Sequence, residues 1–244
     1  MIALVPRCLR TRYSHGMTER SGRVITPVIT ATAASVVFGL LLLAVIARWA
    51  PLFTLDDLVA RTAHDIGDAH PSFVVFWRAV SLACEPLVFR IVAIVALVIV
   101  WVPVRRHGRG RARDVRMPVT IAAATVLVGG ILPVLVKAIV GRPRPVEALI
   151  AAAQTSFPSA HAFGITTAAL CGVLLLRVLD ASQVARRWAA LAAGALIALV
   201  CVARVALAVH YVSDVAAGVA LAVAWVAGVD AVTRRWIAPA PRRG

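Results

Sequence analysis

The feature that most constrains the fold is a series of six apolar stretches, each long enough to cross a lipid bilayer. A crossing needs about 20 mostly apolar residues, because a helix rises about 1.5 Å per residue through a hydrocarbon core of about 30 Å. The stretches cover residues 27–47, 87–104, 117–140, 161–179, 188–208 and 210–233. With 61% hydrophobic and only 15% charged residues, the chain is far more apolar than the core of a soluble domain requires. We therefore expect an all-α, six-span transmembrane bundle.

The last two stretches are almost continuous. The run from Trp188 to Thr233 is too long for a single crossing, so it must turn back on itself. Arg204, His210 and Asp214 mark the place of the turn, because ionisable side chains are costly inside hydrocarbon. We predict a helical hairpin whose tip lies at these residues.

The distribution of basic residues predicts the orientation, because short cytoplasmic loops of membrane proteins accumulate Lys and Arg. With six spans and both termini inside, 18 of the 26 basic residues fall in cytoplasmic segments, whereas seven of the eleven acidic residues fall outside. We therefore expect a multi-pass protein of the cytoplasmic membrane with both termini in the cytoplasm. Its parts would be an N-terminal tail (1–25), a six-helix membrane domain (26–237) and a C-terminal tail (238–244). The first stretch is too long for a signal-peptide core and is expected to remain as an anchor.

The net charge of +15 does not by itself indicate a nucleic-acid partner. Basic residues are dense at 105–116, and a cytoplasmic loop beside anionic lipid requires the same charge, so we expect no nucleic-acid binding. The four cysteines show no paired spacing, which argues against a disulfide framework or a zinc site. A second candidate motif, "HDIGDAH" at 64–70, is better explained as an amphipathic helix lying on the membrane.

Three separated stretches meet the outer face of the predicted bundle: "KAIVGRPRP" (137–145), "FPSAH" (157–161) and "ARVALAVHYVSD" (203–214). They bring a set of polar and ionisable side chains to one membrane depth. The set consists of Lys137, Arg142, Arg144, Ser159, His161, Arg204, His210 and Asp214. Ionisable groups at such a depth usually mark a functional site.

Five of these residues also have a structural explanation. Lys137 and Arg204 fit the pattern of snorkelling anchors, and His161 that of a helix-end histidine bonded to a backbone carbonyl. His210 and Asp214 lie four residues apart on one helical face, where each can satisfy the other. These explanations do not account for the coincidence of all the residues on one face, so we favour a functional site. Lys137 is moreover the only lysine among 26 basic residues, and its compact ammonium is not interchangeable with a guanidinium.

The cations of the set specify an anion, and phosphate fits best. Arg144 and Arg204 can each bind phosphate oxygens bidentately, and Lys137 adds a point charge. Arg142 can face either toward this site or away from it.

The second stretch adds a helix start to the anion site. Pro158 suits the first turn of the fourth span, where a missing N–H costs nothing. The free amides of residues 159–161, including that of Ala160, and the Ser159 hydroxyl would then point at the anion.

The two histidines have different surroundings in the sequence. His210 has a carboxylate partner, Asp214, that can hold one ring nitrogen protonated and leave the other free to attack phosphorus. His161 has no nearby carboxylate in the sequence and is the better candidate for the acid that protonates the leaving group. An alternative use of His161, His210 and Asp214 as metal ligands is disfavoured, because the neighbouring cations would repel a metal ion. A non-catalytic transporter is a further alternative, but it would have no need for a paired nucleophile and acid.

The three stretches resemble the signature motifs of the type-2 phosphatidic acid phosphatase family. These motifs are Lys, six residues, Arg-Pro (137–145); Pro-Ser-Gly-His (158–161); and Ser-Arg, five residues, His, three residues, Asp (203–214). Both spacing and order match over the membrane core, roughly residues 117–233. Two positions depart from the family pattern: Ala160 replaces a glycine and Ala203 replaces a serine.

The resemblance implies a membrane lipid phosphatase that forms a phosphohistidine and uses no metal or other cofactor. By this resemblance His210 is the nucleophile, Asp214 orients it and His161 is the general acid and base. Phosphate would be bound by Lys137, Arg144, Ser159 and Arg204. Partners would be membrane lipids and a lipid phosphate or polyprenyl diphosphate substrate; the particular lipid and the oligomeric state are not indicated.

Overall fold

The computed structural model describes residues 7–101, 111–153 and 155–237, which form helices joined by loops. The helices in these ranges are α1 (Arg7–Ile46), α2 (Ala50–Ala69), α3 (Pro71–Ala83), α4 (Pro86–Trp101), α5 (Arg111–Gly129), α6 (Ile131–Val140), α7 (Ala160–Val178), α8 (Gln183–Ala206) and α9 (Val212–Ile237). Some predicted segments lie outside the described residues: the tail 238–244, the first six residues of the other tail, the end of the predicted second span (102–104) and residues 105–110 of the basic stretch.

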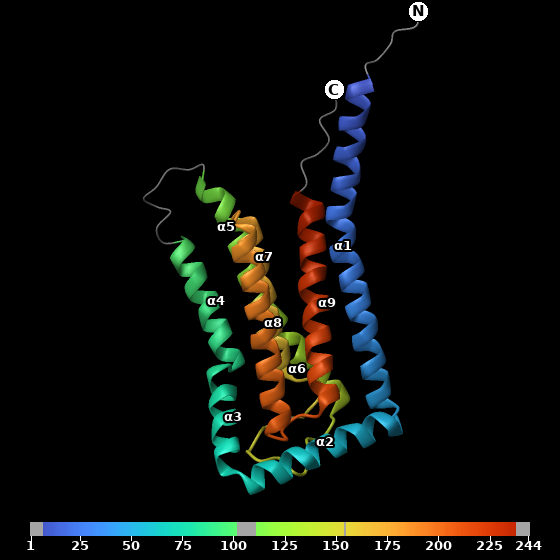
Figure 1. Cartoon of the computed structure of the whole chain (residues 1–244), viewed down its shortest axis with the longest axis vertical. Helices are drawn as coiled ribbons and strands as arrows, with labels where there is room; N and C mark the ends of the chain where they lie inside the picture. Colours follow the sequence, from blue (N-terminus) through green and yellow to red (C-terminus); the bar gives the residue numbers. More distant parts are fainter. Residues whose placement is uncertain (1–6, 102–110, 154, 238–244) are drawn as a thin grey trace, which may run out of the picture.

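Within the described residues, six segments are long and apolar enough to cross a membrane, which confirms the predicted all-α, six-span bundle (Figure 1). They are Ile25–Ile46, Pro71–Val98, Met117–Val140, Ala160–Val178, Gln183–Ala206 and Val212–Arg235. Five of them match the predicted stretches with ends shifted by at most five residues. The start of α1 and the end of α9 lie at one end of the bundle, opposite the end crossed by α2.

The second span starts earlier than the sequence predicted. The prediction began it at residue 87, but the apolar segment Pro71–Val98 includes both α3 and α4, with a break just before Pro86. A proline opens each helix, where no internal hydrogen bond is lost. Arg78 and Glu85 interrupted the apolar pattern in the sequence. Both line a cavity of the protein, so the fold provides these charges with a polar environment inside a spanning segment.

α2 runs across the end of the bundle instead of along it (Figure 1). Its buried face consists of small residues and one carboxylate, spaced at helical intervals: Asp56, Ala60, Ala63 and Gly67. The predicted amphipathic helix at 64–70 is present as far as Ala69, and His64 in it is half-buried. Nδ1 of His64 lies 2.8 Å from the carbonyl of Glu147, so α2 is joined to the loop between α6 and α7.

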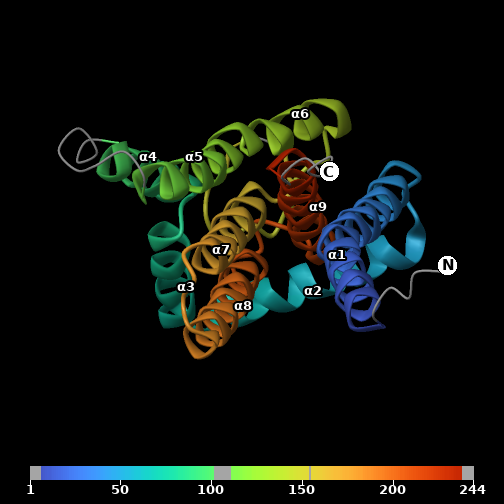
Figure 2. The ribbon, with the colours of Figure 1, turned by 90° about the horizontal axis from the view of Figure 1, so that it is seen from above.

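The predicted hairpin is formed by α8 and α9, with a turn at residues 207–211. Ala208 in this turn adopts a left-handed conformation (φ 49°), which reverses the chain within a few residues. α7 packs against both α8 and α9, and α1 packs along α9 (Figures 1 and 2). The hairpin tip therefore lies beside the start of α7, at the end of the bundle that α2 crosses.

Candidate active site

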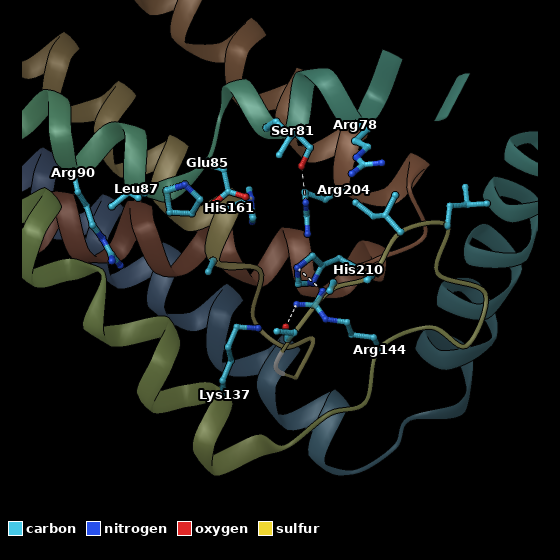
Figure 3. Close-up of a pocket in the computed structure, with 18 residues that line it drawn as sticks. Arg78, Ser81, Glu85, Leu87, Arg90, Lys137, Arg144, His161, Arg204 and His210 are labelled. Atoms are coloured by element: carbon cyan, nitrogen blue, oxygen red, sulfur yellow. Dashed lines mark hydrogen bonds and ion pairs between the residues drawn. The ribbon is translucent and has the colours of Figure 1, made fainter. Parts of the chain in front are cut away.

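The three predicted stretches meet at this end of the bundle and, together with α3 and the start of α4, line a cavity of about 830 Å³. The ionisable side chains among its described lining residues are Arg78, Glu85, Arg90, Lys137, Arg144, His161, Arg204 and His210. Figure 3 shows Arg204 approaching His210 from one side, and Lys137 and Arg144 from the other. Because this lining contains five cations and a single carboxylate, the cavity favours an anion.

The turn after α6 brings Arg144 into the cavity. Gly141 ends α6 in a left-handed conformation (φ 62°) that a residue without a side chain adopts easily. Arg144 then donates through Nη1 to the carbonyl of Val209 (2.6 Å) and through Nη2 to the carbonyl of Ala153 (2.8 Å). Its Nη1 also lies 3.1 Å from Nε2 of His210. The guanidinium therefore joins the α6–α7 loop to the hairpin tip directly beside the histidine.

His210 is buried at the hairpin tip between a cation and a carboxylate. Its Nδ1 lies 3.5 Å from Oδ2 of Asp214, and its Nε2 faces the guanidinium of Arg144. A guanidinium can only donate, so Nε2 is the acceptor nitrogen and the ring proton belongs on Nδ1, toward the carboxylate. Burial lowers the pKa of His210 to about 4, so the ring is neutral at pH 7. The arrangement supplies a neutral imidazole with its unprotonated nitrogen at the cavity.

His161 lies in the first turn of α7 and lines the same cavity. Its Nε2 is 3.4 Å from Oε1 of Glu85, which comes from the junction of α3 and α4. The carboxylate is 44% exposed, whereas the histidine side chain is 14% exposed. The fold thus gives His161 a carboxylate neighbour that is distant in the sequence.

Lys137 and Arg204 are both buried beside the cavity, which does not fit the alternative of snorkelling anchors. Nζ of Lys137 donates to the carbonyls of Thr155 and Ser156, the latter at 3.2 Å. Nη1 of Arg204 donates to the hydroxyl of Ser81 on α3 at 2.6 Å. Both cations are held in place by the protein and can face a bound anion without reaching toward lipid headgroups.

The start of α7 differs from the prediction. Ser159 precedes the first helical residue and caps the helix, accepting a first-turn backbone N–H at 3.5 Å. Its own N–H donates to the carbonyl of Asp214 (2.9 Å), and its side chain is fully buried outside the cavity lining. In this structure Ser159 fixes the helix start, and its contact with the anion stays a prediction. Pro158 lies one residue before the cap, and Ala160 and His161 are the helix-start residues that line the cavity.

The two departures from the family pattern are both accommodated. Ala160 is not among the described non-glycine residues with a positive φ, so an alanine meets no backbone strain there. Ala203 is fully buried in α8, where its methyl group packs without offering a hydrogen bond.

Arg142, whose direction the sequence left open, points away from the cavity. Nη1 donates to Oδ1 of Asp214 (2.8 Å) and Nη2 to Oδ2 of Asp56 (2.9 Å). The residue is buried and is not part of the cavity lining. Of the two directions that the sequence left open for Arg142, the structure has the one away from the cavity, with the guanidinium bonded to two carboxylates behind the site.

Sequence reasoning missed the residues that α2, α3 and α4 contribute: Asp56, Arg78, Ser81, Glu85 and Arg90. A usable signal was present for the charged residues of α3 and α4, because they interrupt an otherwise apolar segment, Pro71–Val98. The sequence carried no comparable signal for Asp56, one of several acidic residues in a polar stretch. Among the residues that the structure describes, no group of three or more His, Cys, Asp or Glu side chains is placed to hold a metal ion.

The fold and the site together define a multi-pass membrane protein with a cation-lined cavity at one end of six spanning helices. Residues 118–237, which contain all three motifs, match the PAP2 superfamily, and this region of the chain therefore belongs to that superfamily. Among curated proteins, none matches the sequence. A similar fold occurs in the crystal structure of a transmembrane PAP2-type phosphatidylglycerolphosphate phosphatase from Bacillus subtilis, with a TM-score of 0.68 and 18% identity. The likeness covers 84% of this chain and 96% of that protein. Membership of the superfamily supports a membrane phosphatase activity.

Proposed function

We propose that the protein hydrolyses a phosphate or diphosphate ester of a lipid through a phosphohistidine on His210, without a metal ion. The observation that carries this proposal is the placement of one imidazole. Its Nδ1 faces the buried carboxylate of Asp214, and its Nε2 faces a cavity lined by Lys137, Arg144 and Arg204.

In the first half-reaction, Nε2 of His210 attacks phosphorus and the bond from phosphorus to the leaving oxygen breaks. His161, on the wall of the same cavity, gives a proton to that oxygen. Lys137, Arg144 and Arg204 stabilise the charge on the five-coordinate phosphorus. Arg144, whose Nη1 lies 3.1 Å from Nε2, turns its donors to the phosphate oxygens when the substrate binds.

In the second half-reaction, His161 accepts a proton from water while the oxygen attacks the phosphohistidine. The bond between Nε2 and phosphorus breaks, and inorganic phosphate leaves. His210 returns to its neutral form with the proton still on Nδ1, and no proton has to pass through Asp214.

The proposed substrate is an amphiphile, because the cavity is lined in part by the spanning segment Pro71–Val98. Phosphatidate, phosphatidylglycerol phosphate, a polyprenyl diphosphate and a lipid-linked sugar phosphate all present a phosphate next to a hydrocarbon tail. The name of the Bacillus subtilis protein adds weight to phosphatidylglycerol phosphate as the first candidate.

The proposed orientation places the cavity outside and both termini in the cytoplasm, on the basis of the arginine distribution. A single cysteine at Glu147, introduced into a background without the native cysteines, is expected to react with an impermeant thiol reagent in intact cells. A cysteine at Asp114 is expected to react only after the cells are permeabilised. The reverse pattern would contradict this orientation.

The activity is tested by phosphate release from a panel of these lipids in detergent, with excess chelator present throughout. We expect hydrolysis of at least one lipid, inhibition by vanadate, which mimics five-coordinate phosphorus, and no activity in His210→Ala. Activity that is lost with chelator and restored by a divalent metal would contradict the mechanism.

A further inference from the structure

Asp56 is a buried carboxylate that the mechanism above does not use. It lies on α2, outside the region that matches the PAP2 superfamily. Its Oδ2 accepts from Nη2 of Arg142 (2.9 Å) and from the hydroxyl of Ser213, and its Oδ1 accepts from the N–H of Ser213 (3.0 Å). Ser213 directly precedes Asp214, so α2 is joined to the chain at the carboxylate that faces His210.

One guanidinium serves two carboxylates in this cluster. Arg142 donates through Nη1 to Asp214 and through Nη2 to Asp56, and the side chains of both acids are fully buried. The rings of Phe53 and Tyr211 pack over the guanidinium, with centroids 4.7 and 4.1 Å from its central carbon. With two buried carboxylates and one buried cation, the cluster retains a net negative charge.

That negative charge bears on the nucleophile. When Nε2 of His210 bonds to phosphorus, the ring keeps its Nδ1 proton and becomes a cation. Oδ2 of Asp214, 3.5 Å from Nδ1, is the carboxylate oxygen that faces this cation. If the whole of Arg142 were available to Asp214, the charges of these two residues would cancel and their stabilisation of the imidazolium would fall. Asp56 prevents this by binding the other half of the guanidinium.

We propose that Asp56 is a positioning residue for the reaction at His210. Because Asp56 shares Arg142, the carboxylate of Asp214 keeps its negative charge. Asp56 also bonds to Ser213 and so fixes the start of α9, which holds the Asp214 carboxylate facing Nδ1 of His210. This inference rests on the proposed function and adds to the three motifs a residue from the helix that crosses the end of the bundle.

The test uses Asp56→Asn in the full-length protein, with release of phosphate from the lipid that the wild type hydrolyses best. Because Asp56 does not line the cavity, we expect kcat to fall about 10- to 100-fold while KM stays within about twofold. Asp65→Asn is the matched control, since Asp65 is an exposed carboxylate on the same helix, and it should retain wild-type kinetics. The temperature of thermal unfolding in detergent is measured for both variants.

A double-mutant cycle separates positioning from folding. In the Asp214→Asn background, adding Asp56→Asn should cost little further activity, because the charge that it protects is already absent. If Asp56→Asn does not fold, Arg142→Lys replaces it, because one ammonium cannot hold both carboxylates in the paired geometry, and the same loss in kcat alone is expected. Three results would overturn the role of Asp56. They are an unchanged kcat in a folded variant, a rise in KM in place of a fall in kcat, and equal losses of activity in the wild-type and Asp214→Asn backgrounds. A wild type that hydrolyses none of the lipids would instead overturn the proposed function itself.

Discussion

The two walls of the cavity differ in how firmly they hold their charges. The motif wall, defined as Lys137, Arg144, Arg204 and His210, has its cations bonded to backbone carbonyls or a buried hydroxyl. The α3–α4 wall, defined as Arg78, Glu85, Leu87 and Arg90, is more open, with Arg78 and Leu87 exposed and the Glu85 side chain 44% exposed. Fixed charges suit the transition state, whose geometry does not vary, whereas an open wall suits a leaving group that differs between lipids.

The largest effect should come from the carboxylate behind the motif wall. Asp214→Asn removes the acceptor that holds the Nδ1 proton of His210, and we expect kcat to fall about 1,000-fold or more, as for a mis-oriented catalytic histidine. Steady-state kinetics on a lipid phosphate measure this loss. Asp230→Asn, which removes a carboxylate bonded to Arg234 on the same helix, should stay within about twofold of the wild type. Equal losses in the two variants would mean that the effect comes from packing of α9.

The next effect concerns the only lysine. Lys137→Arg keeps the positive charge but replaces a compact ammonium that is bonded to two carbonyls, and we expect turnover to fall about tenfold or more. Expression and thermal stability should remain normal, which size-exclusion chromatography and a thermal scan in detergent can check. An unchanged rate would show that the motif wall needs charge alone at this position.

A smaller and selective effect is expected on the α3–α4 wall. Glu85→Gln removes the carboxylate next to His161, so proton donation to the leaving oxygen should weaken, with about a three- to tenfold loss on lipid phosphates. An activated aryl phosphate needs no proton on departure and should be hydrolysed at nearly the wild-type rate. An equal loss of rate on the lipid phosphate and the aryl phosphate would contradict a separate role for the α3–α4 wall in leaving-group protonation.

The smallest effect is expected from mild acid. A pKa of about 4 for His210 leaves Nε2 unprotonated in about nine-tenths of molecules at pH 5, whereas an ordinary histidine would be mostly protonated there. Because protonation of Nε2 blocks attack, phosphoenzyme formation from an aryl phosphate should change little from pH 7 to 5 and fall only as the pH approaches 4. Rapid-quench measurements across this range check the shape. A midpoint near pH 6.5 would contradict the buried, neutral histidine.

Much of the fold was predictable because the bilayer imposes its own pattern on the sequence. Five spans and the hairpin followed from runs of apolar residues, and the turn was marked by Arg204, His210 and Asp214. The second span was misplaced because Arg78 and Glu85 look hydrophilic in a one-dimensional pattern. Only the packed structure shows that they face a cavity instead of lipid.

The site was predictable where its residues share a motif and not where they come from separate helices. The spacing of four residues predicted His210 beside Asp214 on one helical face. The structure keeps the two side chains together, 3.5 Å apart, although His210 lies in the turn before α9 and not in the helix. Two other contacts join residues that are far apart in the chain. His161 lies next to Glu85, and Arg142 forms an ion pair with Asp56. The direction of Arg142 was open for the same reason. Its guanidinium can face an anion in the cavity or two buried carboxylates, and one of these, Asp56, is supplied by α2.

The most direct test of the central claim is to locate the phosphoryl group in a trapped intermediate. The enzyme is mixed with a labelled lipid phosphate, quenched in alkali to preserve phosphohistidine, digested and sequenced by mass spectrometry. We expect an acid-labile, base-stable phosphoryl group on His210, which is absent in His210→Ala and still forms from an aryl phosphate in His161→Ala. Label on another residue, or label that persists in His210→Ala, would contradict it.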